Sequence, residues 1–472
     1  MGDGQVLADY EGVRPAGRRE PRAESTPLPA EAAPDSRRSR RKDKEGKAPA
    51  ENWLARRGHL VSYVGLFLFT VFVFFRPYEL VSAPGLDYGA QVLAVFTLLA
   101  YFPSQLAAEG NLTARPREVV FALLLLLTAL LSVPTAINPP EAWDSFVEFL
   151  KVILMFVVMV NVVRTERRLR GLFLITLAVS VMLSFNAFSD YRSGRLALQG
   201  VRVKGALGGL FDNPNDLALH LVTMIPLAVG LALARRGPLK KVVYGLCAAL
   251  FVAGVVASFS RAGFLGLIAG SGVLAWKYGR RHRLAVAAAL VLSLGVFVAT
   301  APGDYGARIV SMFTGDTTGS VDARRDLFWR SVRVALRYPI TGVGLGNFYY
   351  RGAHDQVSHN AYTQVAAEMG LAALAFYVLF MVTPLRRLRR IERESSADKG
   401  RAKFYHLAVG LQASLAAYMV TSFFASVAHL WYVYYLVGYA VCLRRLYALE
   451  HGAEADASRD APARAAAAAS HL

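Results

Sequence analysis

Residues 210–241 read LFDNPNDLALHLVTMIPLAVGLALARRGPLKK, an apolar run followed directly by a loop with four basic residues. About 20 consecutive, mostly apolar residues suffice for a helix that crosses the hydrocarbon core of a bilayer. Lys and Arg directly beside such a run mark its cytoplasmic end. This stretch therefore predicts a transmembrane helix whose C-terminal end lies in the cytoplasm.

The composition of the whole chain is that of a membrane protein. Hydrophobic residues make up 54% of the 472 residues and charged residues 18%, and the mean hydropathy is +0.35. Soluble domains contain about 45–50% apolar and about 25% charged residues, so a simple water-soluble enzyme is excluded. The two cysteines, Cys247 and Cys442, lie inside apolar runs, which excludes a disulfide framework and a Cys-based metal site.

Apolar runs recur along the chain and predict an all-α polytopic membrane protein with about twelve transmembrane helices. Only a polar turn around Ser258–Arg261 separates two of these runs, and the run at 88–103 is short. The predicted spans are 60–80, 88–103, 118–136, 146–163, 170–188, 210–234, 240–258, 262–277, 284–300, 360–384, 404–424 and 427–445.

The charges of the loops predict the orientation. Residues 164–170, 235–241 and 277–283 contain four basic residues each, and residues 386–403 contain eight. With alternating spans, all four segments lie on the same side as the basic N-terminal tail. The loops at 81–87 and 137–145, on the other side, contain none. This is the positive-inside pattern, and it predicts that both termini lie in the cytoplasm.

Two tails flank the predicted membrane domain, residues 59–449. Residues 1–58 contain 13 basic and 10 acidic side chains and few large apolar ones, so we expect a disordered cytoplasmic tail. The Ala-rich end, 450–472, is also expected to be disordered. The surplus of positive charge, +19 overall, lies mainly beside the spans, which favours lipid headgroups over nucleic acid as its partner.

Two loops predicted on the outer side break the charge pattern. Residues 189–209 contain four basic residues, Arg192 and Arg202 among them, with a single acid. The long outer loop, 301–359, contains seven arginines, including Arg330. Long loops can cross a membrane regardless of their charge. Alternatively, these arginines receive an anionic substrate on the outer face.

Two short motifs lie where outer loops enter predicted helices. Asn213 and Asn215 flank a proline, a turn signature in which Asn215 or Asp216 can cap the following helix. A helix N-terminus at this interface is also an anion site. Arg261, in Ser-Phe-Ser-Arg, lies between two apolar runs. Its guanidinium either snorkels to lipid headgroups or offers bidentate contacts to phosphate oxygens.

Two further motifs lie in the long outer loop. Arg325 and Trp329 are four residues apart, so they share one face of a short helix, whose charges lie in water or face a ligand. The segment 342–346 resembles a phosphate-cradling loop, but no Lys follows it and no strand precedes it, so a tight turn is the better interpretation. His359 and Asn360 precede an apolar helix, which they can cap. A neutral imidazole at this edge can instead remove a proton from a sugar hydroxyl.

The order of these motifs resembles the O-antigen ligase-like membrane proteins. It comprises Asn-Pro-Asn, Ser-x-Ser-Arg, Arg-x-x-x-Trp, Pro-x-x-Gly-x-Gly-x-Gly-Asn, and His-Asn-x-Tyr followed by Glu-x-Gly, over about residues 205–384. These bacterial polytopic glycan transferases include the ligases that attach O-antigen to lipid A–core, polysaccharide polymerases, and protein O-oligosaccharyltransferases.

The resemblance implies a fold of the lipid-linked-sugar glycosyltransferase (GT-C) type in the bacterial inner membrane. The donor would be a glycan on undecaprenyl pyrophosphate, with no metal, cofactor or nucleotide sugar. By motif, His359 would be the base, and Arg261 and Arg325 would hold the pyrophosphate, with Arg324 as the other candidate for the second arginine. We expect supporting or substrate-binding roles for Asn213, Asn215, Arg192, Arg202, Arg330 and Asn360.

Several activities remain open at this point. Transfer to lipid A–core or a similar acceptor is favoured by the His-Asn motif. A repeat-unit polymerase is favoured by two spacings of sixteen residues, Arg192 to Gly208 and Arg330 to Gly346. A protein acceptor is a further alternative. A small-anion transporter would place ionisable residues near mid-membrane, whereas these arginines and His359 cluster at one face.

Overall fold

The computed structural model describes residues 53–81, 85–195, 203–205, 207–235, 237–279, 319–351 and 356–469, and the regular elements in them are helices. The long helices are α2 (Trp53–Phe75), α4 (Gly89–Glu109), α5 (Arg117–Ser132), α6 (Pro139–Val162), α7 (Glu166–Arg192), α8 (Pro214–Ala234), α9 (Pro238–Ala257), α10 (Arg261–Gly279), α13 (Gly319–Arg337), α15 (Leu371–Ser395), α16 (Ala402–Thr421) and α17 (Trp431–Ala469). The short ones are α3 (Pro77–Leu80), η1 (Leu86–Tyr88), η2 (Gly209–Phe211), η3 (Phe348–Arg351), α14 (Ala361–Met369), η5 (Lys399–Arg401) and η6 (Ser422–Phe424).

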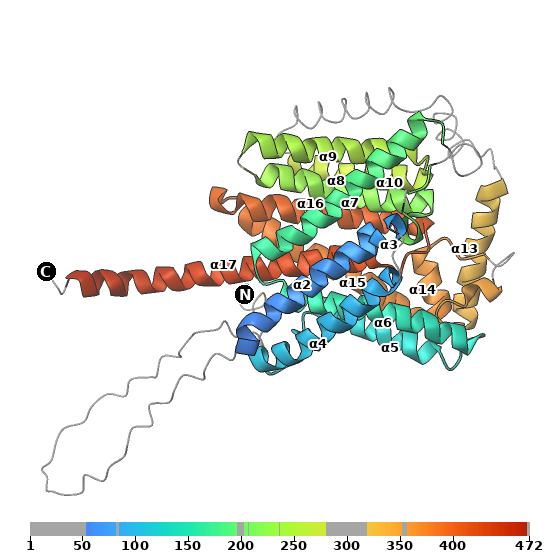
Figure 1. Cartoon of the computed structure of the whole chain (residues 1–472), viewed down its shortest axis with the longest axis horizontal. Coiled ribbons are helices and arrows are strands. Elements are labelled where there is room, and N and C mark those ends of the chain that lie inside the picture. Colours follow the sequence, from blue (N-terminus) through green and yellow to red (C-terminus); the bar gives the residue numbers. More distant parts are fainter. Residues whose placement is uncertain are drawn as a thin grey trace, which may run out of the picture.

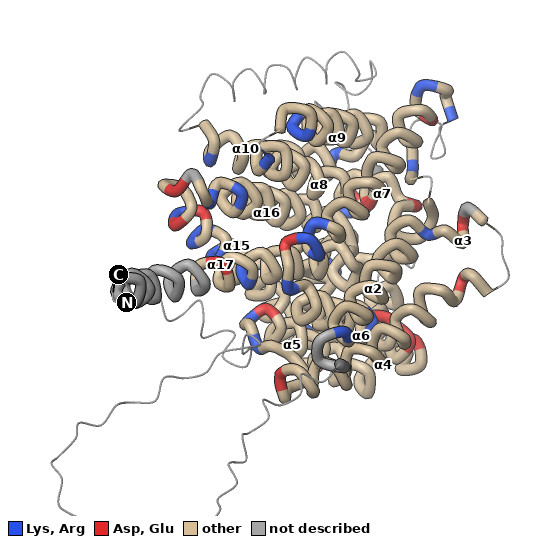
Figure 2. The backbone as a smooth tube through the Cα atoms, turned by 60° about the vertical axis from the view of Figure 1, so that its left-hand side comes forward, with Lys and Arg blue, Asp and Glu red and all other residues tan. Residues whose placement is uncertain are grey.

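The long helices form a bundle, and α13 crosses one of its ends (Figure 1). This end, the site end, contains the turns between α2 and α4, α5 and α6, α7 and α8, α9 and α10, and α16 and α17. The opposite end, the basic end, contains the loops from α6 to α7, α8 to α9 and α15 to α16. Lys and Arg mark the near ends of α9 and α10 in Figure 2, where most of the length of these helices is uncharged.

The prediction of an all-α multi-pass membrane protein is confirmed for the described part of the chain. Eight helices there are long and apolar enough to cross a membrane, among them α2, α6, α7, α8, α9 and α16. Each predicted span overlaps a helix, except 284–300, which lies outside the described residues, as does most of the tail 1–58. The 16 residues of α5 fall short of the roughly 20 that cross a bilayer. Twelve spans and the resemblance to the GT-C fold remain predictions.

Two predicted segments differ from the structure. The span 360–384 is divided at Gly370, which has φ 89, because the Leu371 N–H donates to the Pro339 carbonyl at 2.8 Å instead of continuing α14. Helix α17 runs on to Ala469, through the end of the chain for which disorder was predicted. Alanine has the highest intrinsic helix propensity, so the Ala-rich sequence can continue the helix.

Helix α8 is the centre of the bundle and packs against α9, α10 and α16. It is buried on all sides, which is typical of an interior helix. A Cβ on Gly230 of α8 would lie 2.9 Å from the His406 carbonyl oxygen of α16, and a Cβ on Gly410 would lie 2.8 Å from the Pro226 carbonyl oxygen of α8. Paired glycines let the two backbones approach closely, as in membrane helix pairs generally.

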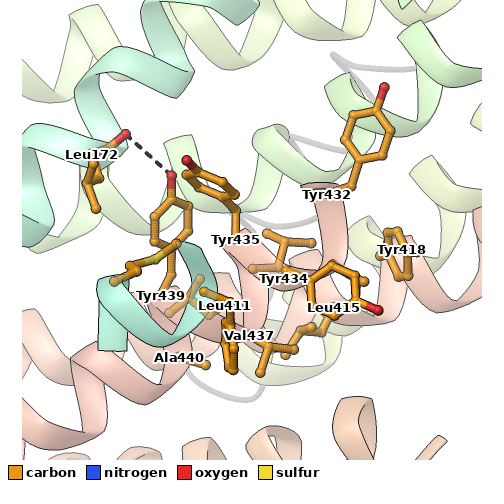
Figure 3. Packing of buried hydrophobic residues seen from close by; sticks show 14 of the residues in the cluster. Leu172, Leu411, Leu415, Tyr418, Tyr432, Tyr434, Tyr435, Val437, Tyr439 and Ala440 are labelled. Carbon is orange, nitrogen blue, oxygen red and sulfur yellow. Dashed lines mark hydrogen bonds between the residues drawn. The ribbon is translucent and has the colours of Figure 1, made fainter. Parts of the chain in front are cut away.

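Tyrosines on α17 join this helix to the core, as Figure 3 shows. Tyr439 donates to the Leu172 carbonyl of α7 at 3.4 Å, and its ring packs edge-on against Tyr435 at 5.9 Å. Tyr432 donates to the carbonyl of Leu210, in the loop that leads into α8. The first turns of α17 therefore support both α7 and the entry to the central helix.

Buried ion pairs hold α17 at the basic end. Arg444 donates to both carboxylate oxygens of Glu118 on α5, at 2.8 and 3.2 Å, and both side chains are buried. Glu109 of α4 pairs with Arg164 and also with Arg445, which lies 3.5 Å away. Burying a charge is costly unless it is paired and hydrogen-bonded, so these contacts fix how α17 docks against α4 and α5.

Candidate active site

The first two motifs meet at the site end through a hydrogen bond. Asn213 caps α8, since its Oδ1 accepts the N–H of Asn215 at 2.9 Å and Pro214 is the first helical residue. The prediction that Asn215 or Asp216 caps this helix is wrong. Pro214 occupies the first helical position, which its fixed φ suits, so the residue before it is the cap. The side chain of Asn215 is buried, and its Oδ1 accepts the Ser260 hydroxyl at 2.8 Å. This contact links α8 to the start of α10.

Helix α10 begins with a strained turn that positions Arg261. Phe259 lies in the left-handed region, with φ 51. Across it, Ser258 Oγ accepts the N–H of Ser260 at 3.3 Å, and Ser260 Oγ accepts the N–H of Gly263 at 3.1 Å. Left-handed backbone at a residue other than glycine costs about 1–3 kcal/mol and clusters at functional sites. The turn places Arg261 in the first helical position, where α10 enters the bundle.

His359 lies in a turn of the same construction. Its φ is 50, and the buried Ser358 Oγ accepts the N–H of Asn360 at 3.4 Å and donates to the Asn360 carbonyl at 3.0 Å. Asn360 Oδ1 accepts the N–H groups of Tyr362 and Thr363 at 2.9 and 3.0 Å. Asn360 therefore caps α14, and the half-buried imidazole of His359 has no part in the cap.

Arg324 lies within electrostatic range of both His359 and Arg261. Its positive charge acts on the His359 imidazole, and the charge of Arg261 in turn acts on Arg324. Arg324 is half-buried, whereas Arg325, to which the motif assigned the pyrophosphate, is exposed on the next position of α13. The structure thus brings together Arg261, Arg324 and His359, here called the triad. Of the two arginines that the motif left open, Arg324 is the half-buried one, because α13 packs with Leu327, three residues further on, against the bundle.

The electrostatics of the triad keep the imidazole neutral. Burial lowers the pKa of His359 below its ordinary value of 6.5, and the Arg324 guanidinium lowers it further. Burial and Arg261 also lower the pKa of Arg324, but a guanidinium stays protonated at neutral pH. The triad therefore combines two cations with one uncharged imidazole.

The glycine-rich segment is a tight turn that packs on the end of α14. The N–H groups of Val343 and Gly344 donate to the carbonyls of Ala367 and Glu368 at 2.9 and 3.0 Å. A Cβ on Gly342, which has φ 68, would lie 2.3 Å from the Glu368 carbonyl carbon. The tight-turn interpretation is confirmed. Gly342 is explained by the close approach of the α14 backbone, whereas a Cβ on Gly344 or Gly346 would meet Ala136 or the Ser145 side chain.

A buried carboxylate completes this contact. Glu368, only 2% exposed, accepts the backbone N–H groups of Gly346 and Phe348, and its carboxylate lies 3.4 Å from Gln364 Nε2. The Glu-x-Gly part of the motif is therefore a clamp: Glu368 holds the turn, and Gly370 ends α14. Through this clamp the segment after α13 is tied to the helix that begins with the His359 turn.

Sequence reasoning missed one contact at the site end. Arg76, with φ 48, pairs with Glu79 at 2.9 Å, and Glu79 Oε2 accepts the N–H of Gly208 at 2.6 Å. A Cβ on Gly209 would lie 1.6 Å from Arg76 Nη1. The pair therefore supports the loop that leads into α8. The sequence signal that could have indicated this contact is Arg76 itself, a charged residue at the end of a long apolar run.

Other predicted site residues lie apart from the triad. Arg192 is exposed at the end of α7, Arg202 lies outside the described residues, and Arg330 donates to the Arg351 carbonyl at 3.2 Å. No described contact joins Arg192 or Arg330 to the triad. In the part of the chain that the structure describes, no three His, Cys, Asp or Glu side chains are grouped so that they could hold a metal ion.

Residues 246–378 match the family model described as O-antigen ligase. The matched region contains all three residues of the triad and the glycine-rich turn, but not the Asn213 cap. No curated protein matches the chain. The match supports the resemblance for this region: residues 246–378 are similar to the O-antigen ligase family.

Proposed function

We propose that this protein transfers a glycan from undecaprenyl pyrophosphate to an acceptor hydroxyl at the outer face of the bacterial inner membrane, as an O-antigen ligase does with lipid A–core or a similar acceptor. The observation that carries the proposal is the position of Arg324, whose charge acts on both Arg261 and His359. Two fixed cations suit a pyrophosphate leaving group, and the neighbouring imidazole suits a hydroxyl nucleophile.

The reaction is a displacement at the anomeric carbon of the donor. His359 accepts the proton of the acceptor hydroxyl while its oxygen bonds to the anomeric carbon. The bond from that carbon to the pyrophosphate oxygen breaks, and the lipid pyrophosphate leaves with its electron pair. Arg261 and Arg324 stabilise the charge that develops on it, since a guanidinium makes bidentate, charge-assisted bonds to phosphate oxygens. These steps require no metal ion.

A buried amide group supports the placement of the acceptor. Asn360 Nδ2 has no hydrogen-bond partner among the described residues, although it is buried beside His359. An unsatisfied buried donor costs about 1–3 kcal/mol. A substrate oxygen that accepts from Asn360 Nδ2 removes this cost, and Asn360 would then both cap α14 and orient a sugar next to the base.

The charge pattern supports the sidedness of the reaction. The described residues of the four basic segments lie at the basic end, and the triad lies at the site end. Residues 280–283 are outside the described part of the chain. Under the positive-inside rule the basic end faces the cytoplasm, together with both termini. The triad then faces the periplasm, where a lipid-linked glycan is accessible after translocation.

Polymerisation of repeat units is the second candidate, and one observation favours it. Arg330 and Gly346 both belong to the segment after the triad arginine, and Gly346 donates its N–H to the Glu368 clamp. The same spacing of sixteen residues separates Arg192 from Gly208, and this repeated spacing is the observation that favours a polymerase. Ligase and polymerase differ in the acceptor and share the leaving-group chemistry, so the triad serves both.

The proposal is tested by transfer in reconstituted vesicles that contain a lipid-linked glycan and an acceptor glycolipid. His359→Gln keeps a hydrogen-bonding side chain but cannot accept the proton, so transfer should fall about 10²–10⁴-fold while donor binding persists. His451→Gln, at an exposed histidine on α17, is the matched control and should transfer like the wild type. Comparable turnover of His359→Gln and wild type at equal abundance would reduce His359 to a structural residue.

A further inference from the structure

A second arginine cluster lies on α13, beyond the triad. A cavity of about 260 Å³ is lined by Arg330, Arg333 and Arg337 of α13 and by Arg351 of η3, together with Val334 and Tyr338. Because a helix rises 1.5 Å per residue, Arg333 lies about 14 Å along α13 from Arg324. The cavity is thus separate from the triad, and the reaction proposed above does not use it.

The four guanidinium groups that line this cavity lie close together and lack carboxylate partners among the described residues. Within the described ranges, none of them forms an ion pair with a carboxylate; Arg330 Nη1 donates to the Arg351 carbonyl at 3.2 Å, and Arg337 lies over the Tyr338 ring at 5.8 Å. Four like charges around one cavity repel each other, and an anion between them removes that repulsion. The lining therefore selects a group with several acceptor oxygens, such as a phosphate.

An apolar stripe runs beside the arginines. Trp329, Leu336 and Ile340 are 53%, 67% and 81% exposed. Their spacing of seven and four residues places Trp329 and Leu336 on one helix face, with Ile340 just past the end of α13. Leu327, in contrast, is buried against the bundle. Helix α13 thus has two apolar sides. One packs on the protein, and no described residue covers the other.

The position of α13 explains what covers that second side. The helix crosses the end of a bundle whose other long helices run along its axis (Figure 1). The ends of membrane-spanning helices lie at the level of the lipid headgroups. An amphipathic helix with basic and Trp or Leu side chains at this level buries its apolar face at the boundary between headgroups and acyl chains.

We propose that α13 is an interfacial helix that binds an anionic phospholipid of the bilayer, with the lipid phosphate in the cavity of Arg330, Arg333, Arg337 and Arg351. Trp329, Leu336 and Ile340 contact the acyl chains next to that headgroup. The lipid anchors the outer segment of the chain and so keeps Arg324, on the same helix, at a constant depth. Binding of the lipid itself does not require glycan transfer.

The experiment measures quenching of Trp329 fluorescence by brominated lipids in vesicles that contain the full-length protein, with Trp329→Phe giving the background of the other tryptophans. Brominated phosphatidylglycerol should quench at lower mole fraction than brominated phosphatidylcholine. Each basic side chain near an anionic surface contributes about 1 kcal/mol, so Arg333→Gln/Arg337→Gln should raise the half-quenching mole fraction of phosphatidylglycerol roughly 10- to 30-fold. Quenching by phosphatidylcholine should not change.

Matched variants and a soluble competitor separate the possible outcomes. Arg389→Gln/Arg393→Gln removes two exposed arginines with the same spacing from α15, at the other end of the bundle, and should leave the preference intact. Ile340→Asp, at a side chain with no packing role, should lower quenching by both lipids. An unchanged lipid preference in Arg333→Gln/Arg337→Gln would overturn the proposal. So would displacement of phosphatidylglycerol by inorganic phosphate, which would assign the cavity to a soluble anion.

Discussion

The two ends of the bundle differ in how their charges are satisfied. At the basic end, charged side chains are paired: Glu118 with Arg444 at 2.8 Å and Lys277 with Glu392 at 2.5 Å. At the site end, Arg324 is half-buried beside a second arginine, and no carboxylate in the described chain forms an ion pair with it. Pairs at the basic end join the helices there. The site end also has a pair, Arg76 with Glu79, but the half-buried charge of Arg324 is retained at a cost in stability that a bound anion would remove.

The largest expected effect concerns the side of the membrane that each end of the bundle faces, because labelling of a residue at either end is all or none. Ser193, after α7, and Ser396, after α15, are both exposed and both donate to a carbonyl of the preceding turn, at 2.6 and 2.8 Å. In right-side-out vesicles, an impermeant maleimide should label Ser193→Cys and not Ser396→Cys. Permeabilised vesicles should show labelling of both. Labelling of both in intact vesicles would show that the two ends face the same compartment.

Breaking a buried pair should strongly lower stability. Glu118→Ala removes the carboxylate that Arg444 contacts with two hydrogen bonds, and breaking such a buried pair costs about 3–5 kcal/mol in the free energy of unfolding. Glu148→Ala removes a carboxylate that is 72% exposed in its pair with Lys151, so its cost should stay within about 1 kcal/mol. Equilibrium unfolding in mixed micelles measures both. Equal costs for the two variants would contradict the claim that the buried pair at the basic end stabilises the fold more than an exposed pair.

The pH dependence of transfer should give the smallest effect. Imidazolium cannot act as a base, so the rate falls as pH drops through the pKa of His359, which burial and Arg324 lower below 6.5. Arg324→Gln removes the nearby cation, raises this pKa and should move the acid limb up by roughly one pH unit. Arg324→Lys keeps the charge and should leave the midpoint in place. A midpoint that is identical in both variants would show that Arg324 does not act on the imidazole.

Helix positions were predictable because local sequence determines them. The apolar runs and the turn at Ser258–Arg261 correspond to helices and to the break between α9 and α10. The division of span 360–384 was not predictable from hydropathy, because α14 ends where the turn at 342–346 packs on it. Contacts between residues distant in sequence decide such breaks, and periodicity carries no information about them.

The candidate site was predictable in its residue types and not in its register. Motif order pointed to Arg261, His359 and one of two neighbouring arginines, but only the packing of Leu327 shows that Arg324 faces inward. The pair of Glu118 and Arg444, 326 positions apart, had no signal in the sequence at all. The two turns at Phe259 and His359 have the same construction, in which a serine hydroxyl accepts the N–H group two residues later. Only the backbone angles and these hydrogen bonds reveal it.

The most direct test of the account is the effect of Arg324→Lys and Arg325→Lys on donor affinity and transfer in the reconstituted system. The two variants change neighbouring residues of α13 in the same way and conserve charge, and they differ in which side chain faces Arg261 and His359. Loss of the planar guanidinium at a bound pyrophosphate should lower transfer by Arg324→Lys by roughly 10²-fold, with weaker donor binding. Arg325→Lys should remain close to wild type. Equal transfer by the two variants, or a larger loss in Arg325→Lys, would contradict the assignment of the half-buried arginine to the leaving group.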